Sequence, residues 1–412
     1  MAIDTPARIA ILGAGPIGLE AALYARYLGY DVDLYERGKA CDALSHWGHV
    51  RMFTPFGQIG SPLGLAALKA QDPAWQPPDA DALLTGHELA ERYYLPLAHS
   101  DLLADSLHEQ TRVVAVAREG LLPGELAGDE ARRDHDFRLL LESTLADDHG
   151  RQRFATADAV IDATGTFRNS NCLGPGGLPA IGELAAGAHF ELGLPDVLSA
   201  RREYFAGRNT LVVGDGCSAA TNVIALAALA SQVADTWVTW VTRGPDTPPI
   251  TPRSGDPFAE RVRIVEQANR LAIDDANHVT HLGGTTVEAI SWHQDLERFT
   301  VRLGGKHAGE AEFDRVIANV GFQADASIGA ALEVAKRSAA EFEAGLADYE
   351  LPTVAPAELL TGEPDFYVLG AKSYGRDSRF LIARGLQQIR AVFTIIGDRE
   401  GLDLYATMKG LY

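Results

Sequence analysis

The sequence predicts an α/β protein made of two similar units, each with a central parallel sheet. Three observations lead to this prediction. A buried strand, a glycine turn, a helix and a second strand follow one another in residues 8–36. The same order recurs in residues 209–243, and in both halves two further strands and a closing strand that ends in glycine come next. With 412 residues, the chain is long enough for two such units.

The first unit opens with the apolar segment 8–12, RIAIL, which has the composition of a strand buried on both faces. Three glycines follow at once in G-x-G-x-x-G spacing: Gly13, Gly15 and Gly18. Apolar residues then recur at helical intervals up to Leu28, where Gly29 is placed to end the helix. This order predicts a strand that runs through a tight turn into the N-terminus of a helix.

A second strand, residues 31–36, ends at Glu36. Glycines in the turn let backbone amides approach a pyrophosphate, the helix N-terminus offers unpaired N–H groups, and an acid at this position accepts hydrogen bonds from ribose hydroxyls. The combination predicts a dinucleotide site rather than a purely structural turn. The residues expected to contact the nucleotide are Gly13, Gly15, Pro16, Ile17, Gly18, Glu36 and Arg37.

A second unit begins with the strand 209–213 and the turn GDGCSA. Ala219 takes the third glycine position, where a small side chain still allows close packing of helix on strand. At the end of the next strand an arginine stands in place of an acid, and arginine suits the 2′-phosphate of NADPH. For Arg243, and for Arg253 further along the chain, a solvated charge is the alternative interpretation. We expect nucleotide contacts from Gly214, Gly216, Ser218, Ala219, Thr242 and Arg243.

Cys217 lies within this second turn, at a position where the motif accepts any residue. The helix N-terminus is expected to lower the pKa of its thiol. The chain has three cysteines, without a C-x-x-C pair or a metal-ligand spacing. We therefore expect no metal site and no dithiol chemistry.

Each unit continues in the same way after its second strand. The expected strands are 111–117, 135–143 and 157–165 in the first unit, and 285–292, 297–303 and 313–321 in the second. The first two strands of each set are expected to pair antiparallel. The third strand of each set ends in glycine, at Gly165 or Gly321.

The motifs of this chain follow the order found in flavoproteins with two dinucleotide-binding domains: GAGPIG, A-T-G at 163–165, the second glycine turn, G-F-x-x-D at 321–325 and a C-terminal FYVLGAKSYGRDSRF. The chain resembles this group, which includes thioredoxin reductase-like enzymes and class B flavin monooxygenases, over nearly its whole length. The resemblance implies two Rossmann-like domains of three layers, each with a parallel sheet and a β-meander. It implies FAD on residues 1–168 and 318–412, and a nicotinamide cofactor on the inserted residues 169–317.

The resemblance also implies roles for residues outside the glycine turns. The further FAD contacts that it implies come from Val114, Thr164, Gly165, Gly370 and Phe380. Many relatives have an aspartate after the C-terminal glycine, bonding the ribityl chain, but here Ala371 and Lys372 follow Gly370. The C-x-x-C and C-x4-C motifs of disulfide reductases and the F-x-G-x-x-x-H motif of class B monooxygenases are missing. The chain thus resembles the wider group rather than one class within it.

The loop 43–58 carries the densest set of chemically active side chains. In similar flavoproteins this segment runs from the adenosine end of FAD toward the flavin ring. Trp47, His49 and Arg51 are therefore the candidate catalytic residues, able to stack on the ring or to orient a substrate. A packed surface loop is the alternative. The region 41–100 is long for a connection and is expected to form a substrate-covering insertion.

Charge and composition restrict the partners. A formal net charge of −20 disfavours nucleic acid and anionic membranes, because both are polyanions. The N-terminal residues lack the pattern of a signal peptide, and the apolar runs are too short to span a bilayer. A cytoplasmic protein without membrane or nucleic-acid partners is expected, and the sequence leaves a homodimer open.

From these observations we expect a FAD-dependent oxidoreductase that uses NADPH. The leading hypothesis is a monooxygenase that acts on a small organic molecule and takes O2 as its second substrate. It depends on the resemblance, on the missing dithiol and on the aromatic loop. A reductase without a dithiol is the enzymatic alternative, and a sensor that binds both nucleotides without turnover is the third hypothesis.

Overall fold

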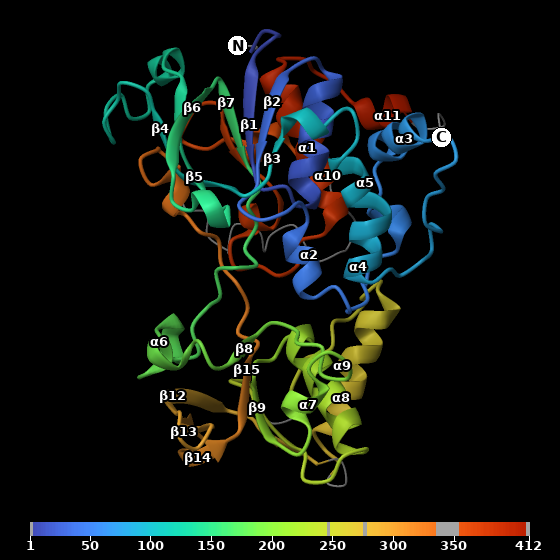
Figure 1. The fold of residues 1–412 in the computed structure, drawn as a ribbon, viewed down its shortest axis with the longest axis vertical. Helices are drawn as coiled ribbons and strands as arrows, with labels where there is room; N and C mark the ends of the chain where they lie inside the picture. The colour runs from blue at the N-terminus through green and yellow to red at the C-terminus, as the bar shows by residue number, and fades with distance from the viewer. Residues whose placement is uncertain (1–2, 245–247, 275–277, 335–353, 409–412) are drawn as a thin grey trace. The chain divides into compact units, whose positions relative to one another are not determined.

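The computed structural model describes residues 3–244, 248–274, 278–334 and 354–408. The chain divides into two compact units: unit 1 is Met1–Phe167 with Gln323–Tyr412, and unit 2 is Arg168–Phe322. Both are α/β units with parallel sheets, which confirms the predicted fold class (Figure 1). The bounds expected for the inserted part, 169–317, differ by one residue at the start and five at the end (168 against 169, 322 against 317).

The parallel sheet of unit 1 has the strand order β16-β7-β1-β2-β3. Its strands are β1 (Arg8–Leu12), β2 (Asp31–Tyr35), β3 (Leu107–His108), β7 (Ala159–Asp162) and β16 (Phe366–Val368). Every neighbouring pair is parallel, so all the carboxyl ends lie at one edge of the sheet. Because β16 pairs with β7, the C-terminal part of the chain completes the sheet that the N-terminal part begins.

Two layers cover this sheet. One face packs against α1 (Pro16–Tyr27) and α10 (Ile382–Ile396), and the other packs against an antiparallel meander of β4 (Thr111–Arg118), β5 (Phe137–Ser143) and β6 (Gln152–Ala157). Alternate side chains of β1 enter the two cores. Ile9 and Ile11 pack with the helices, whereas Ala10 and Leu12 pack with the meander. Burial on both faces explains why β1 reads as a continuous apolar run.

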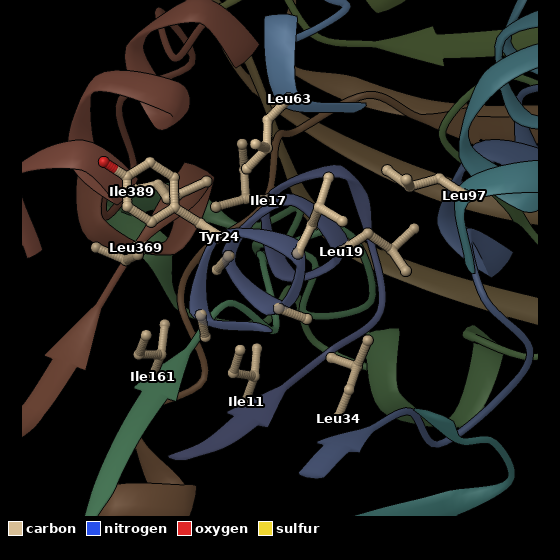
Figure 2. Packing of buried hydrophobic residues seen from close by; sticks show 14 of the residues in the cluster. Ile11, Ile17, Leu19, Tyr24, Leu34, Leu63, Leu97, Ile161, Leu369 and Ile389 are labelled. Carbon is tan, nitrogen blue, oxygen red and sulfur yellow. The ribbon is translucent and has the colours of Figure 1, made fainter. Parts of the chain in front are cut away.

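The region 41–100 packs into the helical core of unit 1. Its helices are α2 (Asp42–His46), η1 (Phe56–Gln58), α3 (Pro62–Gln71), α4 (Gly86–Leu89), the π-helical turn η2 (Ala90–Tyr94) and α5 (Leu95–Ala98). Figure 2 shows Leu63 of α3 and Leu97 of α5 in one cluster with side chains of the sheet and of α1. The segment is therefore part of the core, and its role in covering a substrate stays a prediction.

Unit 2 repeats this plan, as the sequence predicts. Its sheet has the order β11-β10-β9-β15-β8, formed by β8 (Glu191–Leu192), β9 (Asn209–Val213), β10 (Trp237–Val241), β11 (Val279–Leu282) and β15 (Arg315–Ala318). The helix α8 (Cys217–Ala230) follows the central strand β9, and α9 (Ala259–Leu271) packs against α8. The meander consists of β12 (Thr285–His293), β13 (Arg298–Gly305) and β14 (Gly309–Phe313).

Each meander has three strands where the sequence indicates two. The additional strands are β6 in unit 1 and β14 in unit 2. Both are outer strands with mostly exposed residues, so their sequences lack the apolar alternation that marks a half-buried strand. The closing strands β7 and β15 lead to Gly165 and Gly321, where φ is +68° and +80°, in the region that glycine adopts without strain.

Short helices connect these elements. No helix within the described ranges is long and apolar enough to cross a membrane. The short helices are η3 (Ala104–Ser106), η4 (Glu130–Asp134), η5 (Ala146–Asp148), η6 (Pro175–Gly177), α6 (Glu183–Ala186), α7 (Arg202–Phe205), η7 (Ser327–Gly329), η9 (Pro356–Leu359), η10 (Gly370–Tyr374) and α11 (Leu404–Met408).

Glu20 of α1 is a carboxyl group buried in the helical core of unit 1. Its Oε1 accepts a hydrogen bond from the Tyr93 hydroxyl at 2.7 Å, and that hydroxyl accepts one from the Ser61 amide at 3.0 Å. Its Oε2 and the hydroxyls of Tyr94 and Tyr405 are buried without a hydrogen-bond partner among the described residues. Burial raises the pKa of Glu20 to about 7, because the charged form loses its hydration there.

We predict that Glu20 makes the stability of the protein fall as the pH rises. The folded state keeps a proton up to pH about 7, whereas the unfolded chain releases it near pH 4.5. The stabilisation is therefore present below pH 4.5 and is lost as the pH rises through 7, by roughly 3 kcal/mol. Glu20→Gln should remove this slope and be more stable than the parent protein at pH 8. Urea unfolding at several pH values measures it.

The matched control is Glu91→Gln, an exposed acid in the π-helical turn next to Tyr93. Its pH profile should follow that of the parent protein. Parallel pH profiles for the parent protein and Glu20→Gln would contradict the assignment.

Candidate nucleotide-binding sites

The first glycine turn packs against the end of a neighbouring strand. Gly13 has φ +94°, and a Cβ at this position would lie 2.9 Å from the carbonyl oxygen of Ala163, just after β7. A Cβ on Gly18 would overlap the carbonyl oxygen of Gly13 itself. Both positions therefore require glycine for packing alone, because any side chain would separate the turn, the helix and β7.

Gly15, the second glycine of the motif, has a different environment. No atom of the described residues lies within 4 Å of the position that its Cβ would occupy. Gly15 is the N-cap of α1, has extended backbone angles that any residue adopts, and is followed by Pro16. No side chain caps the helix here, so the N–H groups that follow Pro16 in its first turn have no side-chain acceptor. Space and unpaired donors are what a phosphate needs at this point.

Glu36, at the end of β2, accepts hydrogen bonds from the backbone at the same turn. Its Oε2 accepts a hydrogen bond from the Ala14 amide at 2.9 Å, and its Oε1 accepts one from the Gly38 amide at 2.8 Å. Burial raises the pKa of this carboxyl group. Each carboxylate oxygen has a further lone pair, so a ribose hydroxyl can be added to these bonds. The contact of Glu36 with ribose stays a prediction, and the exposed Arg37 follows it.

The C-terminal loop reaches the start of α1. Gly370 has φ +72°, and a Cβ there would lie 3.3 Å from the side chain of Ile17. A Cβ on Gly385 of α10 would overlap Ile17 and lie 3.0 Å from the ring of Phe380. The structure thus brings Ile17, Gly370 and Phe380 together at the carboxyl edge of the sheet. The sequence assigns all three to one site.

A buried ion pair holds this loop, and the sequence does not indicate it. The Lys372 ammonium lies 2.5 Å from Oδ2 of Asp162, the last residue of β7, and donates to the Thr164 hydroxyl at 3.1 Å. That hydroxyl donates to the other oxygen of Asp162 at 2.7 Å. Both charged side chains are almost fully buried. An acid directly before A-T-G and a lysine in an apolar loop are the only sequence signals of this pair.

A second set of hydrogen bonds closes the loop from the other side. The Gly370 amide donates to the side-chain oxygen of Gln388 on α10 at 2.8 Å. The amide nitrogen of Gln388 donates to the Ser373 hydroxyl, which donates to the Gly370 carbonyl, each at 2.8 Å. The polar groups in this ring are buried and satisfied within the loop and α10.

The candidate catalytic residues lie between α2 and α3. Trp47 is half-buried and packs on the helical core, and a Cβ on Gly86 of α4 would lie 2.9 Å from its ring. His49 and Arg51 are exposed, and Arg51 forms an antiparallel bridge with Thr85. Trp47 and Arg51 thus lie against the start of α4, and the catalytic role of all three residues stays a prediction.

Two further residues of unit 1, Val114 and His46, concern the expected FAD site and the candidate catalytic segment. Val114, an expected FAD contact, is half-buried next to a bulge in β4. His46, on α2, meets the ring of Phe167 edge-on with centroids 5.7 Å apart. Phe167 follows the A-T-G segment, so this contact joins the loop after β7 to the segment that holds the candidate catalytic residues.

In the second glycine turn, as in the first, one glycine is required for packing and another lies beside open space. Gly214 has φ +135°, and a Cβ there would overlap the carbonyl oxygen of Asn319, just after β15. The Trp240 indole donates to the Gly214 carbonyl at 2.7 Å and fixes the turn. Gly216 is the uncapped N-cap of α8, and no described atom lies within 4 Å of its Cβ position. Ala219, in the third position, is completely buried.

The end of β10 carries the residues expected to choose between nicotinamide cofactors. Thr242 is buried, and its hydroxyl lies 2.9 Å from Nε2 of His281 on β11. Arg243 is exposed. Arg253 and Arg261 lie close enough to Cys217 for their charges to act on its thiol. Arg253 and the ion pair between Arg261 and Asp256 therefore lie near the start of α8, where Ser218 is the half-buried second residue. His281 is a neighbour that the sequence pattern does not reveal.

The structure corrects the expectation for Cys217. The pKa of its thiol is raised, because burial outweighs the charges of Arg261 and Arg253. Burial likewise raises the pKa of Cys41, whose amide and thiol both point to the Ala14 carbonyl at 3.0 Å and 3.9 Å. Neither thiol is activated.

No model of a protein family matches the chain, and no curated protein matches it. Solved structures do. The bacillithiol disulfide reductase Bdr (YpdA) from Bacillus cereus matches with a TM-score of 0.66 at 19% identity, over 96% of this chain and 99% of that chain. The fold is that of the two-domain dinucleotide-binding flavoproteins.

Two monooxygenases have the same fold. DfoA bound to FAD, the cadaverine monooxygenase of desferrioxamine biosynthesis from Erwinia amylovora, matches with a TM-score of 0.62 at 13% identity, over 96% of both chains. A flavin-containing monooxygenase from Stenotrophomonas maltophilia matches with a TM-score of 0.53 at 21% identity, over 93% of this chain and 98% of that chain. At such identities the likeness is one of fold.

We predict that the glycines of each turn respond differently to alanine. Gly15→Ala and Gly216→Ala place a methyl group in open space, so the thermal unfolding midpoint of the protein should not change. Dinucleotide binding should weaken at least tenfold, about 1.4 kcal/mol, because the methyl group occupies the phosphate position. Calorimetric unfolding and equilibrium titration with dinucleotides measure the two effects.

Gly18→Ala is the matched comparison. Its methyl group would overlap the Gly13 carbonyl, so this variant should lose stability as well as binding. If Gly15→Ala and Gly216→Ala both bind dinucleotides as tightly as the parent protein, the open space beside these glycines is not a phosphate site.

Proposed function

We propose that the chain is a FAD-dependent oxidoreductase that takes hydride from NADPH and uses O2 to oxygenate a small organic molecule. One observation carries the proposal: each unit holds an uncapped helix N-terminus beside a glycine with open space over it, at Gly15 and Gly216. Two such cradles suit two dinucleotides, the reactants of a hydride transfer.

FAD fits unit 1. The N-terminus of α1 would hold its pyrophosphate, Glu36 would accept from its ribose, and the loop at Gly370 would line the flavin side of the site. The C-terminal strand β16 and helix α10 supply this loop, whereas in unit 2 the strand at the matching edge of the sheet, β8, is followed by the short helix α7. DfoA, which has this fold, binds FAD.

NADPH fits unit 2. The end of β10 has no acid to accept from a ribose 2′-hydroxyl, and the exposed Arg243 offers a guanidinium for a 2′-phosphate. Thr242 is already bonded to His281, which leaves the arginine as the group at this strand end that faces solvent. The charge of Arg253 near the start of α8 adds to the attraction for phosphate, whereas Arg261 is paired with Asp256.

When bound, the two cofactors would supply hydride transfer from nicotinamide to flavin and onward transfer of the electrons. The protein contributes orientation and exclusion of water. Trp47, His49 and Arg51 are the residues proposed to contact the substrate. Homodimer formation and a cytoplasmic location belong to the same proposal.

The state of the cysteines favours oxygen over a thiol relay as the acceptor. Cys41 is buried under the first turn, and burial raises the pKa of both its thiol and that of Cys217. Thiol exchange needs a thiolate, which these environments disfavour. A reductase that has no dithiol of its own and passes electrons to a quinone, a small disulfide or an iron-sulfur partner is the second candidate, and the match to a bacillithiol disulfide reductase supports it.

We predict that NADPH bleaches the flavin absorbance of the purified protein under anaerobic conditions. After air is admitted, a lag before the oxidised absorbance returns supports the oxygenase. If the oxidised absorbance returns at once and one equivalent of hydrogen peroxide forms, the result favours the reductase over the oxygenase. FAD-loaded Gly216→Ala is the control, because dithionite should reduce it like the parent protein, whereas half-reduction by NADPH should require at least a tenfold higher NADPH concentration. A parent protein that neither NADPH nor NADH bleaches would contradict the proposal and favour the sensor.

We predict a cofactor-selective effect of Arg243. Arg243→Ala should weaken NADPH binding at least tenfold and leave NADH binding nearly unchanged, because only NADPH carries the 2′-phosphate. The dissociation constants of both cofactors, measured by titration, give the ratio. Arg270→Ala on α9, an exposed arginine of the same unit, should change neither constant. Equal weakening of both cofactors by Arg243→Ala would rule out the assignment.

A further inference from the structure

A cleft of about 500 Å³ opens in unit 1 around the outer strand β6, between the parallel sheet and the meander. None of the residues that line it belongs to a glycine turn. Its volume falls in the range of small-molecule sites. The residues that give it chemical character are Arg8, Asp33 and His108 from the sheet side, and Arg138, Arg153 and Phe154 from the meander.

Cations outnumber acids in this cleft, in a chain whose net charge is −20. The Arg8 guanidinium lies 3.5 Å from the Asp33 carboxylate, and the Arg138 guanidinium lies 3.3 Å from the Glu119 carboxylate. Arg153 is the third guanidinium, so the count is three cations against two acids even with His108 neutral.

Asp33 is shared among several neighbours. Its Oδ1 lies 2.9 Å from Nε2 of His108, and its Oδ2 faces Arg8. The hydrogen bond from His108 is the largest cause that lowers the pKa of Asp33, and the charges of Arg8 and Arg153 add to it. Asp33 is hydrogen-bonded to His108 and paired with Arg8, so it acts on Arg153 through its charge alone, without a hydrogen bond.

Arg153 has no hydrogen bond and no ion pair within 4 Å among the described residues. Its strand register explains its position. Arg153 stands opposite Leu141 of β5, which is buried, so its side chain leaves the strand on the face that packs on the sheet. The fold therefore directs toward the cleft a guanidinium whose N–H groups have no hydrogen-bond acceptor among the described residues.

Phe154 provides an apolar wall at the rim of the cleft. It is 59% exposed, although a phenylalanine on a solvated strand face usually finds cover. The guanidinium of Arg138 lies 4.0 Å from the centroid of its ring. An exposed aromatic ring beside a guanidinium can receive a further planar ring.

We propose that this cleft binds a phosphate-bearing anion through Arg153 and Arg8. Guanidinium groups match phosphate oxygens with two parallel hydrogen bonds, and the surplus positive charge supplies the attraction. Inorganic phosphate and a nucleoside monophosphate share this chemistry. Phe154 distinguishes them, because only a nucleotide has a base to place against its ring.

The experiment is calorimetric titration of the protein, loaded with FAD and saturated with NADP⁺, with inorganic phosphate and separately with AMP at constant ionic strength. The saturating cofactors keep AMP out of the glycine turns. Arg153→Ala should weaken binding of both anions at least tenfold, and Arg153→Glu should abolish it. The exposed position of Arg153 makes both variants compatible with folding, and their thermal unfolding midpoints verify it.

Arg151→Ala is the matched control. Arg151 lies two residues away (153 against 151), is 78% exposed and pairs with Asp148 outside the cleft. It should bind both anions like the parent protein. Phe154→Ala should weaken AMP alone if the ligand is a nucleotide, and no effect of Phe154→Ala supports inorganic phosphate as the ligand. Equal weakening by Arg151→Ala and Arg153→Ala, or no binding of either anion at millimolar concentration, would overturn the proposal.

Discussion

The structure depends on a backbone contact that a side chain would prevent. In unit 1 the turn at Gly13 lies against the carbonyl of Ala163, and in unit 2 Gly214 lies against that of Asn319. Each contact fixes the start of the following helix at the carboxyl edge of a parallel sheet. The uncapped N–H groups and the open space at Gly15 and Gly216 follow from that placement, and so does the capacity for phosphate.

The C-terminal loop is held by a constraint of another kind. In many similar flavoproteins an aspartate after the glycine bonds the cofactor, whereas here Ala371 takes that place and Lys372 pairs with Asp162. Breaking a buried pair by removing one partner destabilises a protein by about 3–5 kcal/mol, because the remaining charge is left unpaired. Protein contacts therefore shape this loop before any cofactor binds, and the Gln388 and Ser373 bonds strengthen it.

The sequence predicts those parts of the molecule that local patterns determine. The strands of both βαβ segments and the glycine turns follow from apolar runs and glycine spacing, and they are found where expected. The outer strands β6 and β14 are not predicted, because exposed strands lack the alternation of apolar residues. The sequence does not reveal two side-chain contacts, Asp162 with Lys372 and Thr242 with His281, because each joins segments that are distant in the chain. The pKa of Cys217 was predicted in the wrong direction because sequence shows the helix terminus but not the burial around it.

A disulfide reductase and a monooxygenase share this fold, so the fold alone does not determine the electron acceptor. The acceptor is selected by groups outside the cradles. In this chain the thiol nearest the first turn, Cys41, is buried against the Ala14 carbonyl, and burial raises its pKa. A relay through that sulfur would require opening the core of unit 1. The packing of Cys41 therefore supports the proposal of an acceptor that needs no relay through this thiol.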